Sequence, residues 1–255
     1  MKIININSKY EITKAQQSFA EEIIYFGEFG EHDRFEDDSI SILMEQIPIF
    51  LLAPENMPDE VEERSEKPAT EYLGFYQHSY SIYGAEMPII GLCPERIIKE
   101  VKNDEELTIL IAIVIIHEFA HAKMKMCINA NYQPIDEFYK WMEEPMANLI
   151  TLIYFQHAER SYRHWYHRPQ QLLLSTKYQT PIDYVKDFIS MQPRNYRLGL
   201  ELFQHRIWHW WKWRNCKAQI QKKTKEKQDW LDYVKNNVGH TTGTKLESLY
   251  EALVK

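Results

Sequence analysis

The chain has 255 residues, of which 44% are hydrophobic and 26% charged, with a formal net charge of −7 and only 8 glycines. These values are typical of a soluble globular protein and argue against an all-β fold with many tight turns. Cys93, Cys127 and Cys216 lie far apart and are odd in number, which indicates a reducing compartment rather than a disulfide framework. The N-terminus lacks the apolar core of a secretion signal, and the longest apolar run, residues 107–116, is too short to span a bilayer. We therefore expect a cytoplasmic protein.

The first hundred residues predict one helix followed by several strands. Residues 14–29 have the apolar spacing of a helix. Residues 39–54 are predicted to form one or two strands, although their period is ambiguous. The acidic, proline-containing residues 53–70 indicate an exposed loop. Residues 71–84 and 87–97 have the composition of strands in one sheet.

The chain is predicted to be helical from residue 104 onward. The first long helix, residues 107–126, is apolar on every side over its first half, which places it in a core. A second helix begins near Asp136, and Pro145 either kinks it or marks its start. Further helices are expected at residues 181–190, at 196–234 and from 245 to the end. Strands followed by helices predict an α+β fold.

The part of the chain from Arg194 onward is basic, whereas the preceding part is acidic. Within it, residues 206–217, RIWHWWKWRNCK, interleave tryptophan with basic residues. This pattern is compatible with nucleic-acid stacking or a membrane surface, or with tryptophans that hold the C-terminal helices on the rest of the protein. For the basic charge we favour a solvated helical face, because no nucleic-acid-binding motif accompanies it, and for the tryptophans we favour the packing interpretation. Neither nucleic acid nor a membrane is expected as a partner.

The end of the apolar helix carries three ionisable residues in the motif HEFAH, residues 117–121. Burying charge without a partner is costly, so a group that meets these side chains is expected. His117 and His121 are four residues apart and therefore share one helix face, from which both can reach one Zn²⁺ at about 2.0–2.1 Å. Glu118 lies about 100° round the helix, in the position of a general base acting on a metal-bound water.

A catalytic zinc needs a third protein ligand and one open position. The favoured candidate is Glu144, which begins an E-x-x-A-N pattern on the second helix. The small Ala147 would let the two helices approach, and Asn148 could accept a hydrogen bond from a ligand histidine. The neighbouring Glu143 is the nearest alternative.

Two further residues are weaker candidates for the third ligand. Cys127 lies six residues after His121, but the glycine that would turn the chain back is replaced by Met124. His157 is rather distant in the sequence.

HEFAH followed by EPMAN resembles the gluzincin group of zinc metallopeptidases. The chain is most similar to the small intracellular branch that includes the repressor-cleaving ImmA/IrrE-like proteases, in which a strand ending in residues like CPERI precedes the active-site helix. The resemblance covers about residues 70–157. It implies a zincin-like metallopeptidase domain over residues 1–165, with a small sheet, an active-site helix and a glutamate helix. A helical C-terminal extension, residues 166–255, would pack on this domain.

The same resemblance implies Zn²⁺ as cofactor, His117, His121 and Glu144 as its ligands, and Glu118 as the base. Asn148 departs from the thermolysin-like members, which carry an acid there. Gluzincins also add a donor that stabilises the oxyanion. For this role we favour Tyr132; the other candidates are Tyr154, His157, Tyr162, His164, Tyr166 and His167.

These features predict an intracellular zinc-dependent peptidase with a protein or peptide substrate and a regulatory protein partner. Residues 87–92, MPIIGL, would be either an edge strand that pairs with an extended substrate or an ordinary core strand. The alternative is a non-catalytic zinc-stabilised regulatory or binding module that contacts nucleic acid through its basic C-terminal helices.

Overall fold

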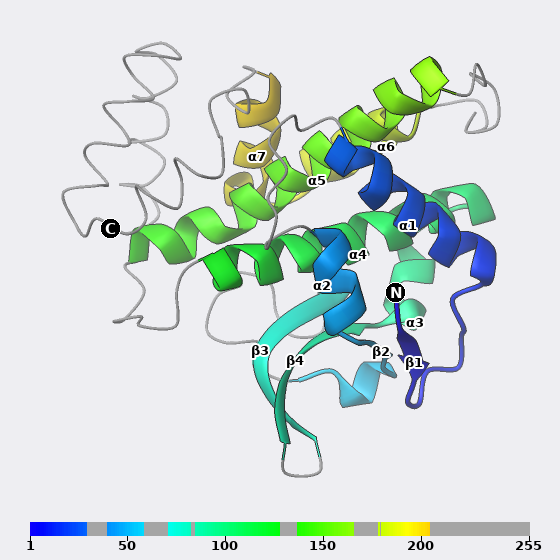
Figure 1. The fold of residues 1–255 in the computed structure, drawn as a ribbon, viewed down its shortest axis with the longest axis vertical. Coiled ribbons are helices and arrows are strands. Elements are labelled where there is room, and N and C mark those ends of the chain that lie inside the picture. The colour runs from blue at the N-terminus through cyan, green and yellow to red at the C-terminus, as the bar shows by residue number, and fades with distance from the viewer. Residues whose placement is uncertain are drawn as a thin grey trace.

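The computed structural model describes residues 1–29, 40–58, 71–82, 85–127, 137–165, 178 and 180–204. These residues form an α+β fold in which helices cover one face of a small mixed sheet (Figure 1). The strands are β1 (Ile3–Asn5), β2 (Ile49–Leu51), β3 (Gly74–Ile82) and β4 (Ala85–Leu92), in the order β1-β2-β4-β3. Strands β1, β2 and β4 are parallel, and β3 is antiparallel to β4. The predicted α+β class is confirmed.

Seven α-helices are described, and most agree with the sequence-based expectation. They are α1 (Lys14–Phe29), α2 (Ile40–Gln46), α3 (Pro94–Ile97), α4 (Asp104–Cys127), α5 (Glu137–Trp165), α6 (Pro181–Ser190) and α7 (Arg194–Gln204). Short 3-10 helices lie at Pro54–Asn56 and Ile98–Glu100. The prediction for residues 205–255, which includes the tryptophan-rich segment, lies outside the described residues.

The prediction of strands over residues 39–54 is wrong for its first half. Helix α2 occupies Ile40–Gln46, and only Ile49–Leu51 form a strand. Ile40, Leu43 and Met44 are all buried, which is the i, i+3, i+4 spacing of a helix face packed on a core. The apolar segment is too short for its period to distinguish a helix from a strand, so tertiary packing decided between the two structures.

Strand β4 differs from its predicted form in two ways. It ends at Leu92, and the following Pro94–Ile97 form a helical turn instead of continuing the strand. A proline in the first turn of a helix loses no hydrogen bond, so the PERI segment starts α3 naturally. β4 also lies between β2 and β3 in the sheet, so the interpretation of residues 87–92 as an edge strand is wrong. The edges of the described sheet are β1 and β3.

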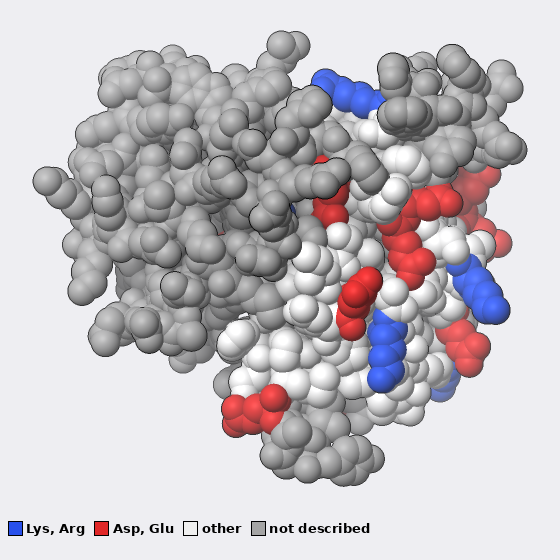
Figure 2. Space-filling model, viewed as in Figure 1, with Lys and Arg blue, Asp and Glu red and all other residues white. Residues whose placement is uncertain are grey.

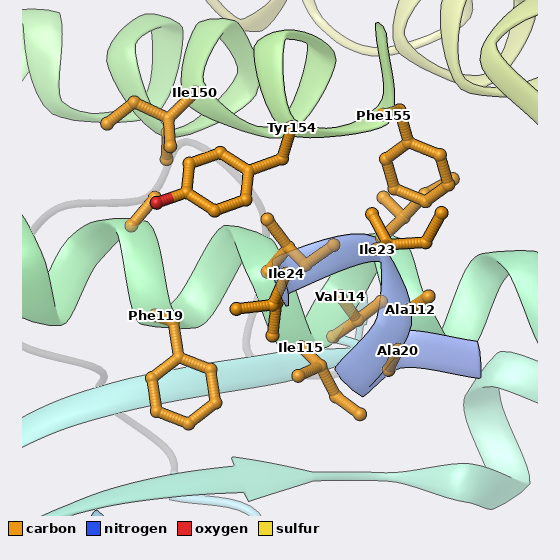
Figure 3. Close-up of a cluster of buried hydrophobic side chains, with 14 of the residues drawn as sticks. Ala20, Ile23, Ile24, Ala112, Val114, Ile115, Phe119, Ile150, Tyr154 and Phe155 are labelled. Carbon is orange, nitrogen blue, oxygen red and sulfur yellow. The ribbon is translucent and has the colours of Figure 1, made fainter. Parts of the chain in front are cut away.

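The main core lies between the sheet and the helices. Alternate strand residues, including Tyr76 and Ile90, join it, whereas Phe75 and Ile89 pack on the opposite face of the sheet. Figure 3 shows side chains of α1 inserted between α4 and α5; its labelled residues are Ala20, Ile23, Ile24, Ala112, Val114, Ile115, Phe119, Ile150, Tyr154 and Phe155. The buried helix α4 is therefore the centre of the molecule.

Helix α4 also has the length and composition of a membrane-spanning segment. The window Asp104–Met124 has a mean hydropathy of 1.7, and 83% of it is buried inside the protein. A core helix of a folded domain has these same properties, because it meets apolar neighbours on every side. We attribute the hydropathy of α4 to this packing.

Helix α5 continues through Pro145, so the interpretation of this proline as the start of the helix is wrong. Helix α7 packs closely on α5 at this point. A Cβ atom on Gly199 would lie 2.4 Å from the carbonyl oxygen of Pro145, so only glycine allows the observed approach. Residues of α6 and α7 belong to the main core, and the domain boundary at residue 165 stays a prediction.

Candidate metal centre

His117 and His121 of α4 and Glu144 of α5 converge at one point. Each offers one ligand atom, and these atoms all lie within 4.8 Å of one another. The Nε2 atoms of the two histidines are 3.1 Å apart, and Nε2 of His117 is 3.1 Å from Oε2 of Glu144. Nε2 of His121 is 3.7 Å from Oε1 of Glu144. The structure thus brings together the three residues predicted as ligands.

These spacings fit a divalent cation. Ligand atoms at about 2.0–2.2 Å from a tetrahedral ion lie about 3.3–3.6 Å from one another. The two ring nitrogens are 3.1 Å apart and lie 3.1 Å and 3.7 Å from Oε2 and Oε1 of Glu144, respectively, and one ligand atom can be chosen from each residue with every pair within 4.8 Å. Two imidazoles and a carboxylate are also a donor set that catalytic zinc sites use. The group could therefore hold a metal ion.

Glu143 occupies a position that the sequence did not assign to it. Its Oε1 atom lies 3.2 Å from Nδ1 of His121, the ring nitrogen that faces away from the other ligands. A carboxylate in this place accepts the ring N–H and keeps Nε2 free to bind a metal. The two consecutive glutamates in the sequence could have indicated this role, because neighbouring residues of one helix can reach the two nitrogens of one imidazole ring.

Asn148, the predicted partner of a ligand histidine, has a different bond. Its Nδ2 atom donates to the carbonyl oxygen of Tyr196 at 3.1 Å, which joins α5 to α7. The spacing of four residues puts Asn148 on nearly the same face of α5 as Glu144, so the bond to Tyr196 follows from the packing of α7 on α5 and not from the helical spacing. Glu143 replaces it beside His121.

Glu118 is buried, with 6% of its surface exposed. Burial raises the pKa of its carboxyl group, and Glu144 and Glu143 raise it further, while His117 and His121 oppose the shift. A raised carboxyl pKa suits a group that must take up a proton near neutral pH. A bound divalent cation would lower this pKa again.

The charges of the site are complementary in the absence of metal. Burial lowers the pKa of His121, but the carboxylates of Glu144 and Glu143 outweigh it and hold the pKa well above its usual value. Burial likewise raises the pKa of Glu144, but His121 and His117 outweigh it and hold that pKa well below its usual value. A protonated His121 and an ionised Glu144 therefore stabilise each other until a cation replaces the proton.

Two of the remaining candidates, Tyr154 and His157, have described side chains, and neither joins this group. Tyr154 donates its hydroxyl to Oε1 of Glu28 at 3.2 Å, and Nδ1 of His157 lies 3.2 Å from the carbonyl oxygen of Gly27. Both side chains therefore bond to residues of α1. Tyr132, Tyr166, His167 and the side chains of Cys127, Tyr162 and His164 lie outside the described part of the structure, so the assignment of Tyr132 stays a prediction.

Comparison of the chain with protein-family models, with curated proteins and with solved structures finds no match. Function is therefore inferred from the geometry of the site.

Proposed function

We propose that the chain is a zinc-dependent peptidase of the gluzincin type that hydrolyses peptide bonds of a protein substrate in the cytoplasm. One observation carries the proposal: three ligand-type side chains from two helices lie within 4.8 Å of one another, and a buried glutamate follows the first of them. A purely structural site has no use for Glu118 beside an open coordination position. The free, buried thiol of Cys93 is compatible with a reducing compartment.

The residues of the site have distinct roles in this reaction. A bound zinc ion would polarise the scissile carbonyl and lower the pKa of water. His117, His121 and Glu144 would hold the ion. Glu118 would accept a proton from the attacking water and pass it to the leaving amine. Glu143 would keep the ring of His121 in the orientation and tautomer that binds the ion.

The sheet offers a place for an extended substrate. Strand β3 is an edge of the described sheet, and α4 packs beside it. An extended peptide can pair with a free strand edge through its backbone. We therefore expect β3, and not residues 87–92, to pair with the substrate.

The decisive experiment replaces Glu118 by Gln, which preserves the shape of the side chain and removes the base. Under the proposal, Glu118→Gln keeps zinc at the wild-type stoichiometry and loses at least about 10²-fold in peptide hydrolysis. Metal content by mass spectrometry and cleavage of a quenched-fluorescent peptide library would measure both. A zinc-free wild type, or equal cleavage by the two proteins, would refute the enzymatic role.

A zinc-stabilised module that binds nucleic acid is the alternative. On the face shown in Figure 2, the described Lys and Arg side chains are separated from one another and stand among Asp and Glu side chains. This part of the surface gives no support to nucleic-acid binding, because a binding face gathers basic residues.

A further inference from the structure

The edge strand β3 contains a β-bulge. Between Gln77 and Tyr80 the pairing of β3 with β4 shifts by one residue, so that His78 and Ser79 stand opposite the single residue Pro88. Proline has no N–H to give to a neighbouring strand, which favours an irregularity at this place. Bulges redirect side chains and are common next to active sites.

Side-chain hydrogen bonds hold this bulge in one shape. Nε2 of Gln77 donates to the carbonyl oxygen of Ser79 at 3.1 Å, and Oγ of Ser79 donates to Oε2 of Glu86 at 2.8 Å. The hydroxyl of Tyr76 lies 3.0 Å from Nδ1 of His78. The ring of His78 is thus attached to a residue that is itself 8% exposed and part of the main core.

The two nitrogens of His78 have different surroundings. Nδ1 faces Tyr76, whereas Nε2 bonds to no side chain or backbone atom in the described ranges, and the residue is exposed. If the Tyr76 hydroxyl donates to Nδ1, the neutral ring carries its proton on Nε2. The outer nitrogen is then a hydrogen-bond donor that points to solvent or to a ligand.

Helix α4 packs on β3, the strand that carries the bulge. A Cβ atom on Gly74, at the start of β3, would lie 2.7 Å from Cγ1 of Val114. Figure 3 shows β3 passing from beneath Val114 to beneath Phe119. Glu118 follows Val114 by one helical turn, about 6 Å along α4, and Tyr76 follows Gly74 by about 6.6 Å along β3.

The faces of the two elements agree with this placement. Gly74, Tyr76 and His78 alternate onto the side of β3 that faces α4. On the helical wheel, Glu118 falls between Val114 and Ile115, which both pack toward the sheet. These rises and faces put Tyr76 abreast of Glu118 and His78 further along the same strand.

We propose that His78 is a substrate-contacting catalytic residue: its Nε2–H donates to the carbonyl oxygen of the scissile peptide bond as negative charge develops there. Tyr76 is the positioning residue that fixes the ring and its tautomer. The inference rests on the proposed peptidase function. No proton is transferred in this step; the donor stabilises the oxyanion formed when water adds to the carbonyl carbon.

The kinetic test compares zinc-loaded variants on the quenched-fluorescent peptide library. His78→Ala should lose about 10²-fold in kcat/KM, mostly in kcat, while zinc content stays at the wild-type value. His78→Gln, which keeps a donor, should lose about 10-fold. Tyr76→Phe should lose less in kcat/KM than His78→Ala does. The double variant Tyr76→Phe/His78→Ala should have the kcat/KM of His78→Ala, since both residues act as one unit.

Two further measurements separate this inference from the peptidase function. Imidazole ¹⁵N spectra of the wild type should show His78 with its proton on Nε2, and Tyr76→Phe should change that signal. A peptide with a phosphonate in place of one peptide bond should bind zinc-loaded wild type about 10-fold or more tightly than His78→Ala.

The outcomes are distinct. If the wild type cleaves nothing but the phosphonate peptide binds with the expected difference, the peptidase function fails and the ligand-contacting role of His78 stands. If His78→Ala stays within about twofold of the wild type in kcat/KM and in probe binding, or if neither protein binds the probe, the inference is overturned. A proton on Nδ1 of the neutral ring would overturn it as well.

Discussion

Nδ1 of His121 lies 3.2 Å from Oε1 of Glu143, the residue that directly precedes the proposed ligand Glu144. One helical turn of α5 therefore carries both the proposed ligand Glu144 and the carboxylate that contacts the proposed ligand His121. The two consecutive glutamates of α5 are therefore as important for the proposed site as the HEFAH motif.

Replacing Glu143 by Ala should weaken zinc binding by about 10–100-fold, because the ring of His121 loses the acceptor that fixes its tautomer. Glu143→Gln, which keeps an acceptor oxygen without charge, should fall between this variant and the wild type. Competition titration against a zinc chelator measures the affinity. Glu201→Gln, an exposed position on α7, is the control and should bind zinc as the wild type does. An unchanged zinc affinity in Glu143→Ala would show that Glu143 does not orient the ring of His121.

Replacing Glu144 by Ala should abolish tight zinc binding, with an affinity loss of more than about 10²-fold, since only two ligands remain. Cys127→Ser should keep the metal, because the three ligand atoms already gathered do not include this residue. Circular dichroism would establish that both variants are folded. Loss of zinc from Cys127→Ser with retention in Glu144→Ala would reverse the ligand assignment.

The stability of the metal-free protein should depend on pH through His121. The pKa of His121 is raised in the folded state, so its stabilising contribution is complete below the unfolded pKa of about 6.5 and is lost as pH rises through the folded pKa. The pKa of Glu144 is lowered, so its contribution is present above about pH 4.3 and is lost as pH falls.

Zinc binds the deprotonated ring of His121, so the stabilisation that zinc gives should increase with pH, whereas the contribution of protonated His121 decreases. The Tm of chelator-treated protein should fall as pH rises above about 6.5 and through the raised pKa of His121, whereas the increase in Tm on adding zinc should grow over the same range. Thermal unfolding followed by fluorescence in matched buffers measures both. A zinc effect that shrinks as pH rises would contradict the assignment of His121 as a ligand.

Gly199→Ala should destabilise the fold by about 1–3 kcal/mol, because the added Cβ would lie 2.4 Å from the carbonyl oxygen of Pro145. Denaturant unfolding measures the free energy of unfolding. Pro145 follows Glu144 in the chain, so a shift of α5 should also weaken zinc binding. Arg197→Ala, an exposed change on the same helix, should leave both quantities unaltered. Wild-type stability in Gly199→Ala would show that α7 is free to move.

The features that could be predicted were local ones. Helices α1, α4 and α6 were expected close to their observed positions, because each has a long or well-bounded apolar pattern. The short α2 was mistaken for a strand, since a seven-residue segment with apolar residues at positions 40 and 42–44 fits either period. The place of β4 inside the sheet was also missed, because strand order depends on contacts between distant segments.

The sequence by itself determined that two imidazoles share one face of a buried helix, since a spacing of four residues is a property of any α-helix. It also indicated that a glutamate of the next helix could join them. Only the tertiary structure decided which glutamate faces which ring nitrogen, that Asn148 bonds to α7 instead, and that β3 carries a bulge at His78. These relationships follow from how α4, α5, α7 and β3 pack, and packing depends on all of the contacting surfaces together.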